Sequence, residues 1–356
     1  MWNLEDLRAR IAPIDRSIVQ RTQHKLDLKT KPRRSLGRLE DLACQYAAIT
    51  GTDTPQLPKK AMVVMGADHG VARRGVSAYP QEVTAQMLLN FAAGGAAINV
   101  LARHADAQVL VVDMGVATPV SAPNVIDARV AAGTNDFTAG PAMTREQAER
   151  ALQTGVELAG RLHRDGVNVI GLGEMGIGNT TSASALTAVL TQSAVEEVTG
   201  FGTGIDEATR SRKIQMIRDA LTRHALLGRQ SNETSAIDVL AALGGFEIAG
   251  LAGVVLGAAA HRMAVVLDGF IASVGALVAV RLVPAAREYL LPSHRSVEAG
   301  HGLVLRALEV LPVLELDMRL GEGTGAALSM TLLDAALRIL AEMATFEAAS
   351  VTDTGA

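Results

Sequence analysis

Several features that would assign this chain to a familiar class of protein are scarce or missing. Its 356 residues include a single cysteine, Cys44, which excludes an intramolecular disulfide, and we interpret this thiol as a small buried hydrophobe. Aromatic residues make up only 3%, the net charge is −4 and no basic run occurs, so nucleic-acid binding is not expected. The N-terminus, "MWNLEDLRAR", is charged and lacks the apolar core of a signal peptide.

Long apolar runs are also absent. The longest one, residues 248–260, is too short to cross a bilayer, so we expect a cytoplasmic protein that has no membrane partner. What the chain does have is 49% hydrophobic residues and 34 glycines, enough for a large, closely packed core. Its length is typical of two domains, or of one large domain with an appendage.

Four apolar segments alternate with helical patterns. The predicted strands lie within residues 61–70, 107–116, 167–176 and 263–270. Helices are predicted over 82–105, with a break at Gly94, and over 144–166, where Thr144 and Gln147 can form a capping box. Strands that are apolar throughout and separated by helices predict a parallel sheet covered on both faces, that is, a Rossmann-like α/β fold.

Both ends of the chain have helical patterns. Residues 1–55 are predicted to be helical, with a break at "TKPRRSLG", and residues 323–347 form a long amphipathic pattern. We expect the two ends to pack together as a small helical domain. The predicted division is an N-terminal part (1–55), a large α/β substrate-binding domain (56–300) and a C-terminal part (301–356) that completes the small domain and the active site.

The stretch "GLGEMGIGNTTSASAL" combines glycines with polar groups. Gly171, Gly173 and Gly176 satisfy the G-x-G-x-x-G pattern of dinucleotide-binding loops, which is a weak signal when it occurs alone. The amides of a helix that starts near Asn179 would favour an anion. Because no acid for a ribose follows at the end of a next strand, we favour a single phosphate, and glycines that serve packing alone remain an alternative.

Other loops that follow predicted strands should meet at the same edge of the sheet. The glycine-rich segment 199–214 leads to Lys213, which is either a charge for a phosphate or a solvated surface lysine. In the segment 291–301, Ser293, His294 and Arg295 are either anion ligands or ordinary loop polarity.

The long polar segment 67–87 lies between a strand and a helix. Asp68 and His69 raise the possibility of a metal, but no second ligand group has a fitting spacing, so we expect no metal. A substrate-binding loop is the better interpretation. Its candidate contacts are Ser77, Tyr79, Gln81 and Gln86.

A carboxylate stands between two glycines before the last helix. Glu322, flanked by Gly321 and Gly323, can simply complement the helix dipole. The apolar flanks suggest instead a partly dry pocket, where the pKa of a carboxylate is raised to a range that suits a general base.

Eleven sequence blocks together resemble a known family. In chain order they are "KPRRSLGRLE", "ADHGV", "GVSAYPQEVTAQM", "GGAAIN", "GTNDFTAGPAMT", "GEMGIGNTTSASAL", "TGFGTGID", "LGGFEIAGLAG", "LDGFIAS", "SHRSVEAGH" and "RLGEGTGAAL". They resemble the nicotinate-nucleotide–dimethylbenzimidazole phosphoribosyltransferase family, from about residue 30 to residue 347. Arg33 and Arg34 stand where the family has Pro-Gly, which puts the path of the 31–37 loop in doubt, and Ala67 replaces a glycine before Asp68.

The resemblance implies transfer of 5-phosphoribose from nicotinate mononucleotide to 5,6-dimethylbenzimidazole in cobalamin lower-ligand synthesis. It implies a homodimer, no cofactor, Glu322 as general base and Glu174 as a second acid. The residues implied for phosphate or nucleotide binding are Gly176, Gly178, Asn179, Thr180, Thr181, Gly202, Gly204, Lys213 and Ser293. Those implied for the base are Ser77, Tyr79, Gln86, Met175 and Leu320.

Two other functions remain as alternatives at this point. One is a nicotinamide-dependent dehydrogenase that uses the G-x-G-x-x-G loop, and the other is a nucleotide sensor without catalysis. The sequence has no hydrophobic-Asp-Asp loop of the kind that binds a magnesium diphosphate, which argues against ordinary diphosphate-dependent phosphoribosyltransferases.

Overall fold

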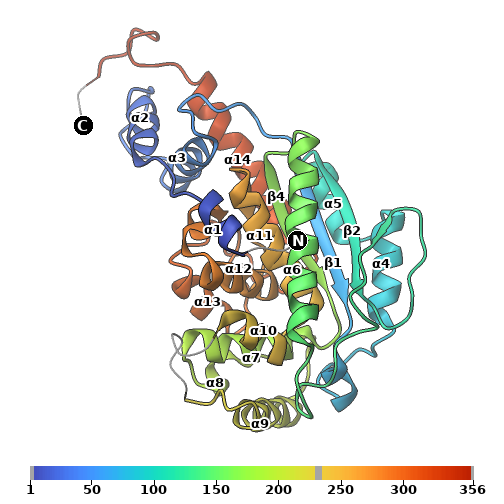
Figure 1. Cartoon of the computed structure of the whole chain (residues 1–356). Helices are drawn as coiled ribbons and strands as arrows, with labels where there is room; N and C mark the ends of the chain where they lie inside the picture. Colours follow the sequence, from blue (N-terminus) through green and yellow to red (C-terminus); the bar gives the residue numbers. More distant parts are fainter. Residues whose placement is uncertain (1–3, 229–234, 354–356) are drawn as a thin grey trace.

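The structure, a computed structural model, describes residues 4–228 and 235–353 and is built on one six-stranded parallel sheet (Figure 1). The strand order is β3-β2-β1-β4-β5-β6. The strands are β1 (Lys60–Ala67), β2 (Ala107–Gly115), β3 (Val125–Asp127), β4 (Val169–Met175), β5 (Ala264–Val266) and β6 (Leu290–Leu291). The winding reverses between β1 and β4, and the expected α/β fold is confirmed.

All four predicted strands are present, and two more were not predicted. The strand β1 is buried along its whole length and β4 nearly so, as expected for strands covered on both faces. The two additional strands, β3 and β6, have three and two residues. Segments this short cannot show an alternation of apolar and polar residues. They are strands because they pair with β2 and β5 through backbone hydrogen bonds.

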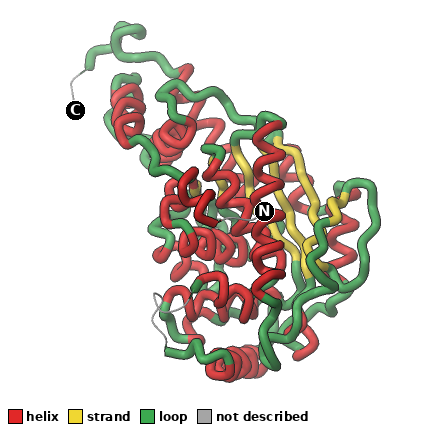
Figure 2. Tube along the Cα trace, in the orientation of Figure 1, coloured by secondary structure: helices red, strands yellow, loops and turns green. Residues whose placement is uncertain are grey.

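Helices surround the sheet (Figure 2). In chain order they are α1 (Leu4–Arg10), α2 (Arg16–Asp27), α3 (Arg38–Thr50), α4 (Val83–Ala93), α5 (Ala97–His104), α6 (Arg145–Arg164), α7 (Asn179–Thr191), α8 (Val195–Val198), α9 (Glu207–Arg223), α10 (Ala236–Leu243), α11 (Phe246–Ala260), α12 (Phe270–Leu282), α13 (His301–Ala307) and α14 (Thr324–Glu342), with 3₁₀ turns η1 (Gly70–Arg74) and η2 (Pro284–Tyr289). The predicted cap of α6 is confirmed, because Thr144 and Gln147 bond each other's backbone N–H.

The two faces of the sheet bury different helices. On β1, Met62 and Met65 point to opposite faces, where Met62 packs at Gly171 with Met330 of α14, and Met65 packs at Gly250 of α11. Helices α4, α5 and α14 therefore share one face, and α11 covers the other with α6 outside it (Figure 1).

The contact between α6 and α11 depends on glycine. A Cβ at Gly155 would lie 2.6 Å from the backbone nitrogen of Val254, and one at Gly253 would lie 2.8 Å from the carbonyl carbon of Leu152. The two helices therefore touch backbone to backbone, which side chains would prevent.

The two ends of the chain meet beside α3. Lys29 forms an isolated bridge with Thr345, and its ammonium donates to the carbonyl of Met343 at 2.6 Å. This pairing ends α14 at Glu342, so the helix predicted to reach residue 347 is five residues shorter. Figure 1 shows α2 and α3 beside this end of α14. Residues 1–3 and 354–356 of the predicted terminal segments lie outside the described part.

The lone thiol lies in this region. Cys44 is buried in α3, and burial raises its pKa to about 11. The interpretation of Cys44 as a core side chain is confirmed.

Two helical stretches are long and apolar enough to cross a membrane by length and composition alone, Val83–His104 and Thr324–Glu342. The first is really two helices, because Gly94 takes a left-handed conformation between α4 and α5, as the predicted break required. The second, α14, packs against α3, α5 and β4. Both stretches belong to the helical layers that cover the sheet.

Candidate active site

One pocket lies at the carboxyl edge of the sheet, where the chain's winding reverses. Its walls come from the turn after β4, the loop before α9, the starts of α7 and α12, the loop after β6 and the segment before α14. Seven of the residues predicted for the site line it, namely Glu174, Met175, Gly176, Asn179, Thr180, Gly202 and Leu320. Ligands of open parallel sheets bind at this kind of edge, and the 199–214 and 291–301 segments both contribute to the pocket, whereas no residue of the 67–87 segment lines it.

The glycines of the G-x-G-x-x-G pattern are needed for close packing. A Cβ at Gly171 would lie 2.7 Å from the methyl carbon of Met62, and one at Gly176 would lie 2.5 Å from the carbonyl oxygen of Ala67. A Cβ at Gly173 would lie 2.7 Å from the carbonyl carbon of Glu322. The glycines therefore let the loop before α14 pack directly on β4. This agrees with the alternative that the glycines serve close packing.

Glu174 ends β4 as a buried acid. Its exposed fraction is 6%, and its carboxylate accepts a hydrogen bond from the amide nitrogen of Asn179. Burial, and then the charges of Glu247 and Asp268, raise the pKa of Glu174 to about 8. The side chain is therefore protonated at neutral pH and can donate a hydrogen bond.

The predicted phosphate-binding corner lies beside Glu174. Helix α7 begins there after Gly178, whose left-handed conformation turns the chain into the helix, and Asn179 and Thr180 of its first turn line the pocket. Lys213 of α9 donates to the hydroxyl of Thr180 at 2.8 Å. With 1% of its surface exposed, Lys213 is not a solvated surface lysine, and burial lowers its pKa to about 8.

Four other predicted phosphate ligands do not line the pocket. Gly178 packs against Ala72, Gly204 is exposed and has a left-handed backbone, and the buried hydroxyl of Thr181 has no hydrogen-bond partner in the described part of the chain. The hydroxyl of Ser293 lies 3.2 Å from Nδ1 of His294, which does line the pocket. Their roles in binding stay predictions.

Most of the residues predicted to contact the base are exposed. The hydroxyl of Ser77 is 3.1 Å from that of Thr203, a pocket residue, so the 67–87 segment reaches the glycine-rich loop. Tyr79 is 56% exposed and Gln86 is also exposed, on α4. Leu320 is 58% exposed at the mouth of the pocket. These exposed side chains stay predicted base contacts.

Glu322 lies on the other side of the loop that carries Gly321. Its backbone is left-handed, with φ +62°, which costs a non-glycine residue about 1 kcal/mol. The residue is 6% exposed, and its carboxylate accepts from the backbone N–H of Ile98, at the start of α5, at 3.3 Å. Burial and the charge of Asp268 raise the pKa of Glu322, and the Ile98 hydrogen bond opposes this effect.

An acid that the sequence did not single out holds this loop in place. Asp268, which follows β5 after Leu267, accepts hydrogen bonds from the backbone N–H groups of Gly323, Gly325 and Ala326. It therefore caps α14 from another part of the chain, and burial raises the pKa of its carboxyl. The sequence placed residues 263–270 in a predicted strand, and nothing local marks Asp268 as a cap of a helix more than fifty residues away.

Asp68 and His69 contact different partners. In residues 4–228 and 235–353, no group of three or more His, Cys, Asp and Glu side chains is arranged to hold a metal ion. His69 instead lies between Ser182 and Glu247, and Asp68 accepts from the N–H of Ala117.

Arg295 does not line the pocket. Its side chain is 60% exposed and lies near Glu315, whereas the adjacent His294 is buried. Of the two alternatives for this segment, Arg295 fits an ordinary polar residue of a surface loop.

Comparison with known proteins places this chain in a family. A family model described as "Phosphoribosyltransferase" matches residues 11–351. The chain belongs to this phosphoribosyltransferase family. It is 53% identical over 344 residues to the nicotinate-nucleotide–dimethylbenzimidazole phosphoribosyltransferase of Chloroflexus aggregans, covering 96% of each chain, and 52% identical over 350 residues to that of a Roseiflexus species, covering 98% of each.

A solved structure agrees with this assignment. The crystal structure of CobT from Thermus thermophilus superposes with a TM-score of 0.89 at 45% identity, covering 94% of this chain and 99% of that one. The resemblance inferred from the sequence blocks is confirmed, and this chain is a transferase. Neither the dehydrogenase nor the sensor alternative finds support.

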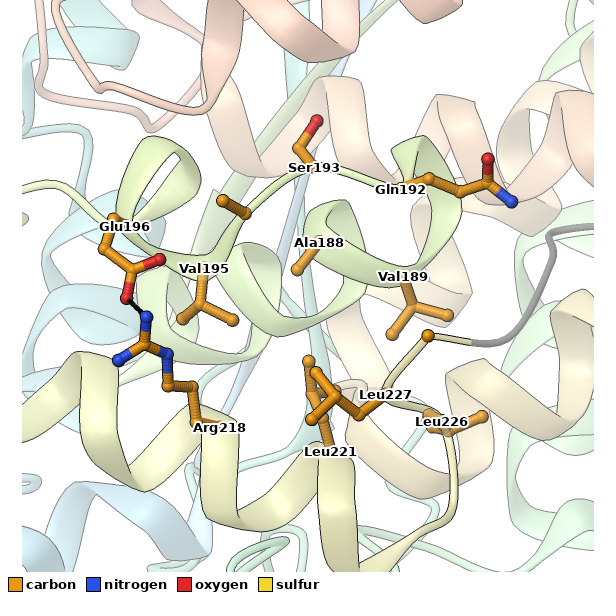
Figure 3. Close-up of a pocket in the computed structure, with 12 residues that line it drawn as sticks. Ala188, Val189, Gln192, Ser193, Val195, Glu196, Arg218, Leu221, Leu226 and Leu227 are labelled. Atoms are coloured by element: carbon orange, nitrogen blue, oxygen red, sulfur yellow. Dashed lines mark ion pairs between the residues drawn. The ribbon is translucent and has the colours of Figure 1, made fainter.

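A separate hollow lies beyond the far end of α7 (Figure 3). Apolar side chains of α7 and α9 face it, including Val189 and Leu221, and an ion pair between Glu196 and Arg218 closes one side. It contains none of the residues predicted for the phosphoribosyltransferase site. The pocket at the sheet edge is therefore the candidate active site.

Proposed function

We propose that this phosphoribosyltransferase transfers the 5-phosphoribosyl group of nicotinate mononucleotide to 5,6-dimethylbenzimidazole. The products are α-ribazole 5′-phosphate and nicotinate, within cobalamin lower-ligand synthesis. The observation that carries the proposal is Glu322, a buried carboxylate with a raised pKa on a strained backbone, directly after Leu320 and Gly321, which line the pocket. The relatives named above bear the name of this activity.

The chemistry needs one base and no acid for the leaving group. In the donor, the ring nitrogen bonded to C1′ is a pyridinium. The glycosidic bond therefore breaks without protonation and releases nicotinate with a neutral ring nitrogen. One benzimidazole nitrogen attacks C1′ while Glu322 takes the proton from the other nitrogen. Attack opposite the leaving group converts the β-linkage into an α-linkage. Before it takes this proton, the carboxylate of Glu322 stabilises the oxocarbenium-like charge at C1′.

The phosphate end of the donor fits the corner at α7. In this proposal Thr180, in the first turn of α7, supplies its backbone N–H and its hydroxyl, and Lys213 supplies a positive charge. In this proposal Glu174 stays protonated beside the donor and avoids repelling its phosphate and carboxylate. The acceptor then lies toward Glu322, Met175 and Leu320.

The broader setting follows the same proposal. We infer a cytoplasmic homodimer with no cofactor, no nucleic-acid partner and no membrane partner. We retain the division into 1–55, 56–300 and 301–356. In this division α2, α3 and the end of α14 form the small domain. Helix α13 belongs to the 301–356 part but packs on α7 and α12 of the large domain.

The direct test is a reaction with purified protein. Nicotinate mononucleotide and 5,6-dimethylbenzimidazole are incubated with the enzyme, and nicotinate and α-ribazole 5′-phosphate are quantified by chromatography. We expect equimolar products that depend on both substrates. Binding of the nucleotide with no nicotinate released would contradict the proposal and restore the sensor alternative.

Lys213→Ala is expected to raise the KM for nicotinate mononucleotide by about tenfold or more with a smaller change in kcat, because a buried charge-assisted contact to phosphate is lost. In the wild type, the KM should rise as pH increases through about 8, where the ammonium loses its proton. Initial rates across pH provide the measurement, with the exposed Lys59→Ala as control. An unchanged KM in Lys213→Ala would place this lysine outside the site.

A further inference from the structure

One hydroxyl group joins two loops beside the pocket. Oγ1 of Thr203, a pocket residue in the glycine-rich loop before α9, accepts a hydrogen bond from the backbone N–H of Ala78 at 3.0 Å. The same oxygen is 3.1 Å from the hydroxyl of Ser77, which accepts from the backbone N–H of Tyr79 at 3.2 Å. In the described part of the chain, the hydrogen bonds between these two loops therefore all involve one atom.

The 67–87 segment is attached to the turn after β4 on both sides of these bonds. On one side Ala72 packs against Gly178, where an added Cβ would lie 3.2 Å from the Cβ of Ala72. On the other side the buried hydroxyl of Thr84 accepts from the backbone N–H of Ile177 at 3.1 Å. Between these two points the chain is largely exposed. The hydroxyl that joins the loops therefore sets where the middle of the segment lies relative to the pocket.

The turn that carries Thr203 packs on the predicted phosphate-binding corner. Gly202, the preceding residue, has a left-handed φ of +53°, and a Cβ there would lie 3.0 Å from Oγ1 of Thr180. Lys213 donates to that same oxygen at 2.8 Å. A ligand that orders the hydroxyl of Thr180 and the ammonium of Lys213 therefore also acts on the turn.

We propose that Thr203 is a positioning residue that couples the two substrate sites of the transferase. Its hydroxyl fastens the 76–80 loop to the turn that packs on Thr180, so that a nucleotide bound at the phosphate-binding corner orders the loop predicted to contact the base. The inference rests on the proposed function for the identity of both ligands. It gives a role to the contact between the "GVSAYPQEVTAQM" and "TGFGTGID" blocks.

Coupling of this kind is reciprocal. If the bound nucleotide raises the affinity for the base, the bound base raises the affinity for the nucleotide by the same factor. The acceptor ring then meets an ordered binding loop only when its phosphoribosyl donor is in place.

The first experiment follows hydrogen exchange in the 76–80 loop and needs no activity. Exchange of the backbone N–H groups of Ala78 and Tyr79 is measured by mass spectrometry, without ligand and with saturating nicotinate mononucleotide alone. In the wild type we expect the nucleotide to slow this exchange by about fivefold or more. Calorimetry verifies that the nucleotide is bound.

Thr203→Val retains the shape of the side chain and removes the hydroxyl. Without ligand, exchange of the Ala78 and Tyr79 N–H groups should be faster in this variant than in the wild type, because the tie between the loops is lost. Addition of the nucleotide should no longer slow it. Thr203→Ser keeps the hydroxyl and should retain both the slow exchange and the response.

The matched control is Thr154→Val. The hydroxyl of Thr154 donates to the carbonyl of Arg150 within α6, so its removal should leave exchange in the 76–80 loop unchanged. Circular dichroism verifies that each variant is folded, and Thr203→Ala takes the place of Thr203→Val if the latter does not fold.

The second readout is kinetic. In Thr203→Val the KM for 5,6-dimethylbenzimidazole should rise by about fivefold or more with a smaller change in kcat, and Thr203→Ser should restore it. A hydroxyl that merely bound the nucleotide phosphate would behave differently. Its loss would weaken nucleotide binding in calorimetry without the base, and it would leave loop exchange in the free enzyme as in the wild type.

Three results would overturn the inference. They are loop exchange in ligand-free Thr203→Val equal to that of the wild type, a loop in Thr203→Val that still responds to the nucleotide, and a wild-type loop that does not respond to bound nucleotide. A wild-type enzyme whose loop is ordered by the nucleotide but which releases no nicotinate would instead defeat the proposed function, while the coupling would stand.

Discussion

Glu322→Gln is expected to lower kcat by about 10²-fold or more, the usual consequence of losing a general base. The amide retains the side chain's shape and can still accept the hydrogen bond from Ile98, so the loop and α14 should remain in place. What the variant loses is the ability to take the benzimidazole proton. Initial rates of α-ribazole 5′-phosphate formation at saturating substrates measure this loss.

The pH dependence provides a second view of the same residue. The base must be ionised to act, so wild-type kcat should fall as pH decreases through the raised pKa of Glu322. That acidic limb should disappear in Glu322→Gln. The matched control is Glu309→Gln, because Glu309 is also a left-handed glutamate but is 70% exposed and pairs with Arg287. Near-normal turnover in Glu322→Gln would remove Glu322 from the mechanism.

Gly173→Ala is expected to be almost as damaging, although it adds only a methyl group. The new Cβ would lie 2.7 Å from the carbonyl carbon of Glu322 and 3.1 Å from the backbone nitrogen of Gly323, both backbone atoms that no side-chain rotation can move aside. We expect the free energy of unfolding to fall by about 1–3 kcal/mol. Because the displaced atoms belong to the base itself, kcat should fall by about tenfold or more.

Denaturant unfolding and initial rates test this prediction side by side. Gly140→Ala is the control, since a Cβ there meets no atom within 4 Å and Gly140 does not have a positive φ. A Gly173→Ala enzyme with wild-type stability and wild-type rate would mean that β4 and the 321–323 loop do not rest on each other as described.

The comparison of sequence and structure is most instructive at the G-x-G-x-x-G stretch. The pattern correctly indicated a strand followed by a helix at the sheet edge, because glycine spacing and polar side chains are local signals. It could not tell which atoms need the glycines. Those atoms are the backbone of Glu322 and of Ala67 and the side chain of Met62, all more than a hundred residues away in the chain.

Charged residues show the same limit more sharply. Lys213 looked as much like a surface lysine as a phosphate ligand, and only burial against Thr180 separates the two. Asp268 and Glu247 were not singled out at all. Their importance comes from the partners that the fold brings to them. Asp268 accepts from three N–H groups of α14 and the loop before it, and Glu247 contacts the imidazole of His69.

By itself the sequence determined the α/β class, four of the strands, the cap of α6 and the family, because periodicity, capping and long motif blocks are written in adjacent residues. The tertiary structure alone decided which acids are buried together at the end of β4 and which of them keep their protons. The reason is physical: a pKa depends on the water and the charges around a group, and here both are set by segments that meet only when the sheet has formed.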